Sequence, residues 1–371
     1  MAVSLLDLRA QHAAIRDDVV AALMRVVDDQ AFILGEPVAR LERAIAALSH
    51  TRHAIGCANG SDAILLALRA LDVGAGDEVI TTPFTFFATA GAIHNVGARP
   101  VFVDIDPVTF NIKPAEIPAA ITPRTKAVIP VDLFGQMAAL ERVAGVAAGL
   151  PIIEDAAQSI GARRSVDGEW RMAGEMATIG TFSFFPSKNL GGYGDGGMVV
   201  TQDEGLAKRL LRLRTHGGVK TYFHEEVGYN SRLDALQAAV LEAKLPHLAA
   251  WSARRRVNAA AYTEAFADIA DVVRTPVVLP ENESIFNQYT IRAVRRDALQ
   301  AHLTARGIGT SVYYPLPLHL QPCFAYLRYT RGQFPESERA ATEVLALPVY
   351  PELPDAQRDE VIGAVRAFYG R

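Results

Sequence analysis

Lys188 is the residue of this chain whose type and setting best suit covalent chemistry. A short apolar run over residues 180–186 ends in Ser-Lys, and glycines then stand at nearly every second position up to residue 197. Glycine lets the backbone come close to a ligand. A lysine that is partly shielded from water has a lowered pKa and can attack a carbonyl group. The alternative for Lys188 is a solvated loop lysine, which is the ordinary state of this residue type.

The same loop contains a Gly-x-Gly-x-x-Gly pattern, formed by Gly192, Gly194 and Gly197. In dinucleotide-binding proteins this pattern follows a strand and opens a helix. Here residues 198–201, Met-Val-Val-Thr, are typical of a strand. The context therefore argues against a nicotinamide site and leaves the lysine to be explained.

A candidate phosphate site precedes the helical pattern of residues 61–71. Gly60 permits a tight approach, and Ser61 and Asp62 are good helix-capping residues. Free amides at a helix N-terminus, together with the helix dipole, attract phosphate. A simple helix cap is the alternative interpretation of the same three residues.

A candidate acid stands at the end of a buried, strand-like run, where Asp155 follows Ile-Ile-Glu. A buried carboxylate is costly unless it has a cationic partner, and a protonated ring nitrogen would be one. The alternative is an Asp that caps the next helix. Glu154 alternates to the other face and is the weaker candidate.

These residues belong to a region, 51–201, in which helical and strand-like segments alternate. Such alternation predicts a mostly parallel sheet covered by helices on both faces, with ligands beyond the carboxyl ends of the strands. The expected strands are 78–82, 101–104, 127–131, 152–155, 181–184 and 198–201, and the expected helices are 61–71, 87–96, 137–148, 206–216 and 233–245.

The rest of the chain predicts a second, smaller unit. A long amphipathic segment over 248–267 leads away from the sheet, and further segments combine helical and β-rich patterns. We expect a large domain over 1–248, with an N-terminal helical segment, and a smaller α+β domain over 249–371. Helices are expected at 296–306, 335–345 and 356–369, and a strand at 288–294.

Composition narrows the class of protein. The 371 residues are 50% hydrophobic and 21% charged, with a net charge of −4, which suits a globular enzyme and argues against disorder. No basic block points to nucleic acid or a membrane surface. No run approaches the ~18 apolar residues of a membrane span, and no secretion signal is recognised. The two cysteines, Cys57 and Cys323, are each expected to be small buried residues in a reducing cytoplasm.

Together the three candidate groups match the needs of one cofactor. Pyridoxal 5′-phosphate requires an anion site, an acid for its pyridine nitrogen and an amine for its Schiff base. The phosphate site, Asp155 and Lys188 occur in this order within one predicted sheet.

Over essentially its full length the chain resembles the sugar aminotransferases of the DegT/DnrJ/EryC1/StrS family, which have the fold-type I architecture of pyridoxal phosphate enzymes. The resemblance implies a large domain with a mostly parallel seven-stranded sheet and a smaller C-terminal α+β domain. The matching segments are 76–80, 83–89, 130–136 (Pro-Val-Asp-Leu-Phe-Gly-Gln), 154–159 (Glu-Asp-Ala-Ala-Gln-Ser), 183–191 (Ser-Phe-Phe-Pro-Ser-Lys-Asn-Leu-Gly), 194–197 and 230–237 (Asn-Ser-Arg-Leu-Asp-Ala-Leu-Gln).

The resemblance also implies roles for single residues. Lys188 would form the Schiff base and carry the proton, and Asp155 would face the pyridine nitrogen. Gln158 would lie near the cofactor's phenolic oxygen, and Phe86 would stack on its ring, although Phe86 would otherwise be read as core. The residues expected to hold the phosphate are Ser61, Asp62, Ser183 and, from the neighbouring subunit of a homodimer, Asn230.

Substrate positions follow from the resemblance as well. Tyr313 and His319 lie in a segment that resembles the one closing over the sugar. His216 and His224 lie in or next to a loop that resembles the mobile segment at the entrance for the nucleotide sugar. No metal is expected.

The implied activity is transfer of the amino group of L-glutamate to a nucleotide-linked ketosugar, leaving 2-oxoglutarate, with pyridoxamine 5′-phosphate as intermediate. Residues 230–234 resemble the members that aminate C3. The alternatives are amination at C4 of a 4-keto-6-deoxy sugar, a sugar dehydratase, in which histidine replaces the lysine, and a non-catalytic regulatory homologue.

Overall fold

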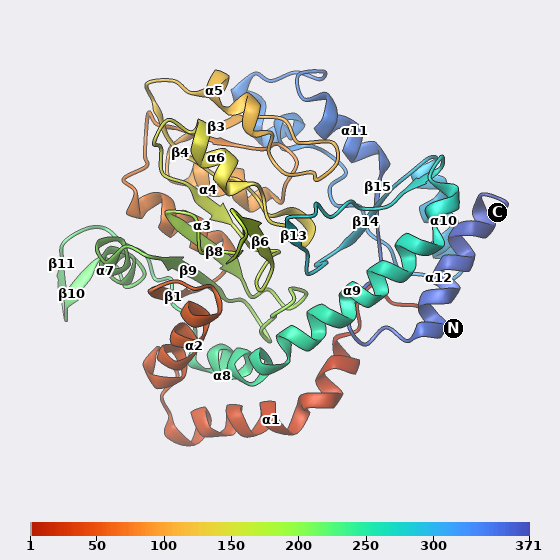
Figure 1. Ribbon diagram of the computed structural model, residues 1–371. Coiled ribbons are helices and arrows are strands. Elements are labelled where there is room, and N and C mark those ends of the chain that lie inside the picture. Colours follow the sequence, from red (N-terminus) through yellow and green to blue (C-terminus); the bar gives the residue numbers. More distant parts are fainter. Residues whose placement is uncertain (1) are drawn as a thin grey trace.

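The computed structural model describes residues 2–371, and its core is one seven-stranded sheet (Figure 1). A four-stranded part, β1-β9-β8-β5, and a three-stranded part, β4-β2-β3, are joined by parallel bridges from Val128 to Ile152 and from Val131 to Asp155. β9 is antiparallel to both neighbours, and the other six strands run parallel to one another. The prediction of a mostly parallel seven-stranded sheet is confirmed. Along the sheet the strands are β1 (His53–Cys57), β9 (Gly197–Thr201), β8 (Ile179–Ser183), β5 (Ile153–Asp155), β4 (Thr125–Val128), β2 (Glu78–Thr81) and β3 (Arg99–Phe102).

Helices cover both faces of this sheet because successive strand residues point to opposite sides. Val79 and Val199 pack with α3 (Gly60–Ala70), α4 (Phe87–Asn95) and α7 (Glu204–Leu213). Their neighbours Ile80 and Val200 pack with α2 (Gly35–Leu48), α6 (Leu140–Val146) and α8 (Ala235–Lys244). The strands are therefore buried on both faces, as their nearly continuous apolar sequences require. The remaining helices of this part are α1 (Leu8–Asp29), which packs on α8, and α5 (Ile117–Ala120).

The C-terminal part has its own core around the antiparallel sheet β12-β14-β15. The long helix α9 leads into it and lies alongside it in Figure 1. Val3 joins the same core and pairs with Ile308, so both ends of the chain lie in this part of the molecule (Figure 1). The division into domains at residue 248 stays a prediction. The elements are α9 (Leu248–Ala265), β12 (Val273–Arg274), β14 (Tyr289–Ala293), α10 (Arg296–Ala305), α11 (Pro335–Glu343), β15 (Val344–Leu347) and α12 (Asp355–Phe368).

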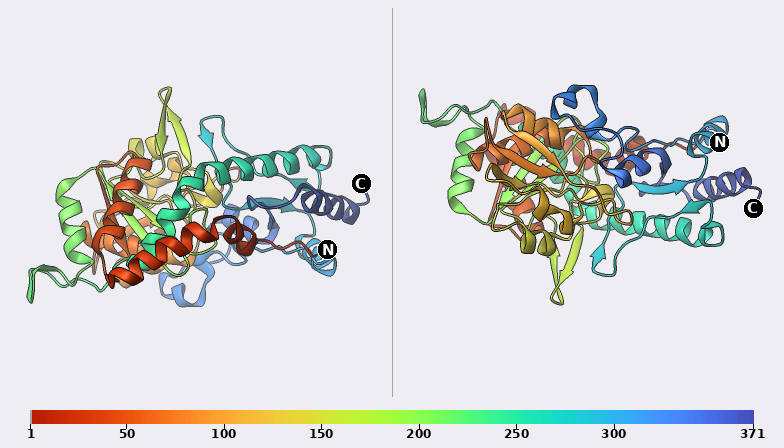
Figure 2. Two further views of the ribbon diagram at one scale, coloured as in Figure 1. Left: turned by 90° about the horizontal axis from the view of Figure 1, so that it is seen from below. Right: turned by 90° about the horizontal axis from the view of Figure 1, so that it is seen from above.

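Two hairpins project from the molecule, as the views in Figure 2 show. β10 (Gly218–Lys220) and β11 (Phe223–His224) form one at the far end from the termini. β6 (Arg163–Val166) and β7 (Glu169–Met172) form the other, with β13 (Asn282–Glu283) added at its edge. Short 3-10 turns lie at Pro114–Glu116, Leu133–Gly135, Leu245–His247, Ala267–Ile269, Leu318–Leu320 and Pro322–Leu327.

Three expectations differ from the structure. The helix expected over 137–148 begins only at Leu140, and the helix expected over 335–345 ends at Glu343. Val344 and Leu345 instead start β15, because a short apolar run fits a buried strand as well as a buried helix. Cys57 is buried as expected, but Cys323 is exposed, and both are free thiols.

Within residues 2–371 no helix is long and apolar enough to cross a membrane.

Candidate active site

The sheet brings Lys188 and Asp155 to the same edge. β5 and β8 are parallel neighbours in which Asp155 pairs with Thr181, so their carboxyl ends meet there. Asp155 ends β5, and Lys188 follows β8 after a turn in which its N–H donates to the carbonyl of Phe185 at 2.8 Å. Burial lowers the pKa of the half-buried Lys188 amine to about 8, while the charge of Asp155 opposes that shift. The amine is thus close to its nucleophilic, neutral form near physiological pH.

The lowered pKa of Lys188 predicts how the cofactor-free protein reacts with pyridoxal 5′-phosphate. The neutral amine attacks the aldehyde, so the rate should rise with pH through about 8 and then level off. An ordinary lysine would keep gaining rate up to about pH 10.4. Stopped-flow absorbance across a pH series, with Lys188→Ala as the blank, measures this. A midpoint near pH 10 would contradict the assigned environment.

Asp155 is held from two sides. Thr89 Oγ1 donates to its Oδ2 at 2.8 Å, and the N–H of Ala157 donates to its Oδ1 at 3.3 Å. Burial raises the pKa of this carboxyl, while Thr89, Ala157 and Lys188 counteract the rise. Glu154 points to the opposite face, where its Oε2 accepts from the N–H of Gly174 at 2.9 Å. The carboxylate on the lysine side is therefore that of Asp155.

A cradle for an anion forms where α3 meets the end of β8. The N-cap is Asn59, whose Oδ1 accepts from the N–H of Asp62 at 2.8 Å. The expectation that Ser61 and Asp62 are the cap is therefore wrong, because α3 already begins at Gly60. The N–H groups of Gly60 and Ser61 have no hydrogen-bond partner within residues 2–371. Gly60 and the side chain of Ser183 lie close together.

The closeness of Gly60 to Ser183 leaves no room for a side chain at residue 60. A methyl group there would lie 2.6 Å from Ser183 Cβ and 2.9 Å from its Oγ. We expect Gly60→Ala to weaken cofactor binding by about tenfold or more, since overpacking costs about 1–3 kcal/mol. Gly145→Ala is the matched control, because that helical position has no neighbour within 4 Å. Cofactor titration followed by absorbance measures both. Equal affinity in the two variants would contradict the cradle.

Gln158 and two aromatic residues line the same edge. The Gln158 side chain accepts from the N–H of Phe134 at 2.7 Å, and its Nε2 donates to the hydroxyl of Tyr314 at 3.2 Å. Phe86 precedes α4 and is 57% exposed, with its ring 6.3 Å from that of Tyr314. An exposed ring suits stacking on a planar ligand.

Two residues of this site did not follow from the sequence. Thr89 supports Asp155, and Tyr314 supports Gln158. Both lie in segments that carry the family resemblance, and that position was the only signal available for them. Their spacing from Asp155 and Gln158 in sequence gave no sign of contact.

The structure places the expected substrate residues apart from one another. Tyr313 is partly buried beside Tyr314, at 5.9 Å between ring centroids. His319 is 2% exposed, packs on Phe334 and contacts Glu338 Oε1 through Nε2 at 3.1 Å. Burial also lowers the pKa of His319. Its enclosure argues against direct contact with a substrate in this conformation.

The two other expected substrate histidines lie in or next to the outlying hairpin β10–β11. His216 and His224 are both exposed, and His224 Nδ1 contacts the carbonyl of His216 at 3.0 Å. The hairpin projects away from the central sheet (Figures 1 and 2). The structure therefore does not bring these histidines to the lysine of their own chain.

Asn230 is exposed and lies near the cradle of its own chain. The neighbouring Ser231 hydroxyl accepts from the N–H of Ala58, two residues before Gly60, at 3.3 Å. Asn230 does not cap α8, which begins at Ala235 after Asp234.

The residues present fit pyridoxal 5′-phosphate. The cradle offers free amides and a hydroxyl to a phosphate, Asp155 offers a carboxylate to a ring nitrogen, and Lys188 offers an amine to an aldehyde. Phe86 offers an exposed face. Within residues 2–371, no group of three or more His, Cys, Asp or Glu side chains is arranged to hold a metal ion.

Comparison with known proteins agrees with this arrangement. Residues 13–366 match the model of the DegT/DnrJ/EryC1/StrS aminotransferase family. A Geobacillus stearothermophilus protein named pleiotropic regulatory protein is 53% identical over 100% of this chain and 99% of its own. An Acidithiobacillus ferrooxidans UDP-N-acetyl-3-dehydro-alpha-D-glucosamine 3-aminotransferase is 46% identical over 98% and 97%. The crystal structure of S. venezuelae DesV is 42% identical and superposes with a TM-score of 0.96, covering 100% and 99% of the two chains.

Proposed function

This chain belongs to the DegT/DnrJ/EryC1/StrS aminotransferase family, whose cofactor is pyridoxal 5′-phosphate, and we propose that it transfers the amino group of L-glutamate to a nucleotide-linked ketosugar. The observation that carries the proposal is the meeting of Lys188, Asp155 and the Gly60–Ser183 cradle at one edge of the sheet. Each of these groups serves a different part of the same cofactor.

The proposed mechanism divides the work among the chain's own side chains. When bound, the cofactor supplies an electron sink that stabilises negative charge on the amino-bearing carbon. Lys188 Nζ would anchor the cofactor and, once the amino donor has taken its place, would move the proton at the substrate carbon. Asp155 would hold the proton on the ring nitrogen, and Thr89 orients Asp155. Gln158, aligned by Phe134 and Tyr314, would help to hold the cofactor.

Addition of glutamate to the cofactor-loaded protein tests this function. The absorption of the pyridoxal form should give way to that of pyridoxamine 5′-phosphate, and 2-oxoglutarate should appear in equal amount. An unchanged spectrum would refute the proposal. A regulatory role, suggested by the name of the 53% identical relative, would instead leave the amine donor unconsumed. The intact set of Lys188, Asp155 and Gln158 favours the enzyme.

The position of amination is proposed to be C3 of the sugar. The pattern of residues 230–234 favours C3, and the 46% identical relative is named as a 3-aminotransferase. Incubation with purified 3-keto and 4-keto nucleotide sugars, followed by mass spectrometry and NMR of the product, distinguishes the two positions. Exclusive turnover of the 4-keto compound would refute the C3 assignment.

The active unit is proposed to be a homodimer with shared sites. The hairpin β10–β11 projects from the molecule and exposes large apolar side chains, including Tyr222 at 91% and Phe223 at 58%. Several large apolar side chains gathered in and next to one exposed hairpin, here also Val219 and Val227, mark a surface that favours burial against another chain. We also propose that the enzyme works in the cytoplasm, which suits its free cysteines.

A hybrid dimer tests whether Asn230 acts across the interface. Lys188→Ala subunits and Asn230→Ala subunits are mixed and allowed to exchange. If Asn230 serves the other subunit's site, each hybrid contains one site with both residues intact, so activity should return to about half per hybrid dimer. If Asn230 serves its own site, the hybrid has no intact site and stays impaired. Lack of recovery after proven subunit exchange would overturn the shared-site assignment.

A further inference from the structure

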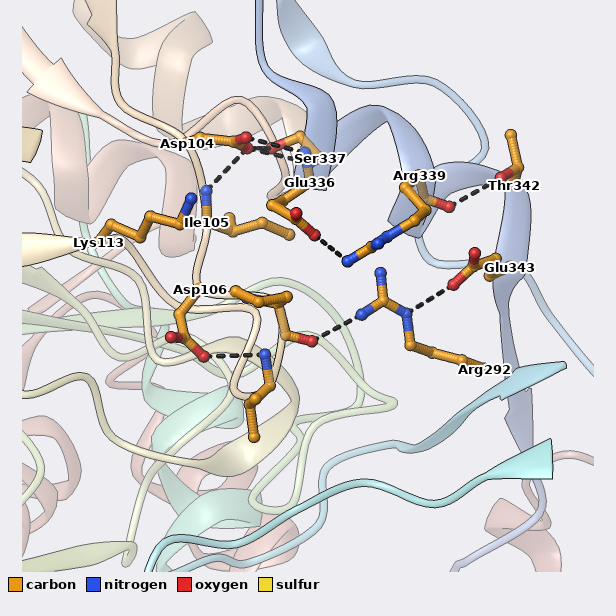
Figure 3. Close-up of polar contacts among 12 residues, drawn as sticks. Asp104, Ile105, Asp106, Lys113, Arg292, Glu336, Ser337, Arg339, Thr342 and Glu343 are labelled. Atoms are coloured by element: carbon orange, nitrogen blue, oxygen red, sulfur yellow. Dashed lines mark hydrogen bonds and ion pairs between the residues drawn. The ribbon is translucent and has the colours of Figure 1, made fainter. Parts of the chain in front are cut away.

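Three arginines from three different elements meet in a groove of the C-terminal part. Arg274 comes from β12, Arg292 from β14 and Arg339 from α11. The groove has a volume of about 530 Å³, and none of the cofactor or substrate residues named above lines it. Figure 3 shows Arg292 and Arg339 facing each other across it.

Arg274 and Arg292 are direct partners across the antiparallel pair β12–β14. Directly opposite residues share one face of a sheet, with Cβ atoms about 5 Å apart, and like charges in this position are destabilising. The guanidinium of the exposed Arg274 has no hydrogen bond or ion pair within residues 2–371. The pair therefore leaves uncompensated positive charge at the groove.

Arg292 is nine-tenths buried and only partly satisfied. Its Nε donates to Glu343 at 2.9 Å, and its Nη1 donates to the carbonyl of Pro107 at 2.6 Å. Its Nη2 is buried without any hydrogen-bond partner. In Figure 3 this nitrogen points toward the guanidinium of Arg339. An unpaired donor of a buried charged group is destabilising, and the facing cation adds repulsion.

The carboxylates around the groove are already engaged. Glu343 binds Arg292, Glu336 binds Arg339, and Asp297 binds Arg296 at 2.6 Å. Asp271 contacts Arg371 at 3.3 Å. Arg295 stacks over the ring of Phe368 instead of pairing with an acid. The free positive charge thus stays with Arg274 and with the open side of Arg292.

We propose that this groove binds a phosphate group between Arg274, Arg292 and Arg339. Guanidinium forks match phosphate oxygens in geometry, and donors from three sides suit a tetrahedral dianion better than a planar carboxylate. Arg339 is exposed, and among the described residues 2–371 its guanidinium pairs with Glu336 alone, so it can swing to admit an oxygen to Arg292 Nη2. The groove has no aromatic lining for a base, which favours a small phosphate compound over a nucleotide.

The site lies where the sheet-bearing part meets the C-terminal part. Arg292 binds Pro107 and lies 5.2 Å over the ring of Phe110, both in the loop after β3. Asp104 in the same loop accepts hydrogen bonds from the N–H groups of Glu336 and Ser337 at the start of α11 (Figure 3). Bound phosphate would therefore strengthen a contact between the two parts and should raise the thermal stability.

Calorimetric titration of the cofactor-loaded enzyme with inorganic phosphate, at ionic strength held constant with chloride, tests the site. The loaded cofactor keeps its own phosphate site filled. Arg274→Gln and Arg339→Gln should each weaken binding by about tenfold or more, since each removes charge-assisted hydrogen bonds. Arg306→Gln, an exposed arginine outside the groove, should bind as the parent does. We avoid Arg292→Gln because it would remove the hydrogen bonds that Arg292 donates to the Glu343 carboxylate and to the carbonyl of Pro107.

Thermal unfolding gives a second readout. Without phosphate, Arg274→Gln should be no less stable than the parent, because it removes a like-charge pair. The rise of Tm with phosphate should be lost in Arg274→Gln and Arg339→Gln and kept in Arg306→Gln. Absence of binding by the parent enzyme, or unaltered phosphate affinity in both groove variants, would overturn the proposal. Tighter binding of succinate than of phosphate would refute the phosphate assignment.

Discussion

Lys188→Ala should reduce turnover by about 10⁴-fold or more, the largest loss we expect from any single substitution in this chain. The amine has two duties in the proposed mechanism, since it anchors the cofactor and then moves the proton at the substrate carbon. Within residues 2–371, Lys244 is the other lysine whose pKa is lowered to about 8, and its ammonium is engaged, since it donates a hydrogen bond to the carbonyl of Gly191 at 2.6 Å.

The measurement is the rate of 2-oxoglutarate formation from glutamate, together with the loss of cofactor absorbance on dialysis. Lys208→Ala is the matched control, because Lys208 is an exposed helical lysine that pairs only with Glu204 at 2.6 Å. Lys208→Ala should retain both activity and cofactor. Turnover by Lys188→Ala at a rate near that of the control would mean that the proton is moved by another group.

The sheet was predictable because each strand and each helix has its own pattern of apolar residues in the sequence. The segments around β2, β8, β9, α3 and α4 were expected within a few residues of their observed bounds. The Gly192–Gly197 pattern was rightly rejected as a dinucleotide site, since the strand β9 follows it. β1 was missed, and so were the hairpins β6–β7 and β10–β11. Their short polar or mixed sequences acquire strand structure only through pairing with distant partners.

The candidate site, like the fold, has residues that the sequence suggested and contacts that it did not. Gly60, Asp155, Ser183 and Lys188 became candidates because each stands at the end of an element, where a parallel sheet collects its ligand-binding groups. Contacts such as that of Thr89 with Asp155 join residues that lie 66 positions apart, and no local sequence pattern predicts them. The burial of His319 was not foreseen for the same reason, because it depends on contacts with Phe334 and Glu338, which belong to another segment.

Asp155→Asn should lower kcat by about 10²–10³-fold, the range typical for loss of one preorganised electrostatic group. The substitution keeps the shape of the side chain and one acceptor, so its carbonyl oxygen can still accept from the N–H of Ala157, while its amide nitrogen donates to the Thr89 hydroxyl in place of the bond that Asp155 accepted. It removes the negative charge that would hold a proton on the ring nitrogen, so the electron sink weakens while the cofactor can still bind. Both half-reactions should slow together, as measured by single-turnover absorbance with glutamate and with 2-oxoglutarate plus the pyridoxamine form.

Glu154→Gln provides a closely matched control for that substitution. Glu154 is the adjacent residue of the same strand and is equally enclosed, but it faces the other side of the sheet, with Asp132. Burial, followed by the nearby charge of Asp132, raises its pKa well above the ordinary value, so an isosteric neutral amide reproduces its protonated form. We expect near-normal kcat for Glu154→Gln. If kcat fell in Glu154→Gln and stayed near normal in Asp155→Asn, the carboxylate at the ring nitrogen would be that of Glu154, on the opposite face. That result would refute the site as described.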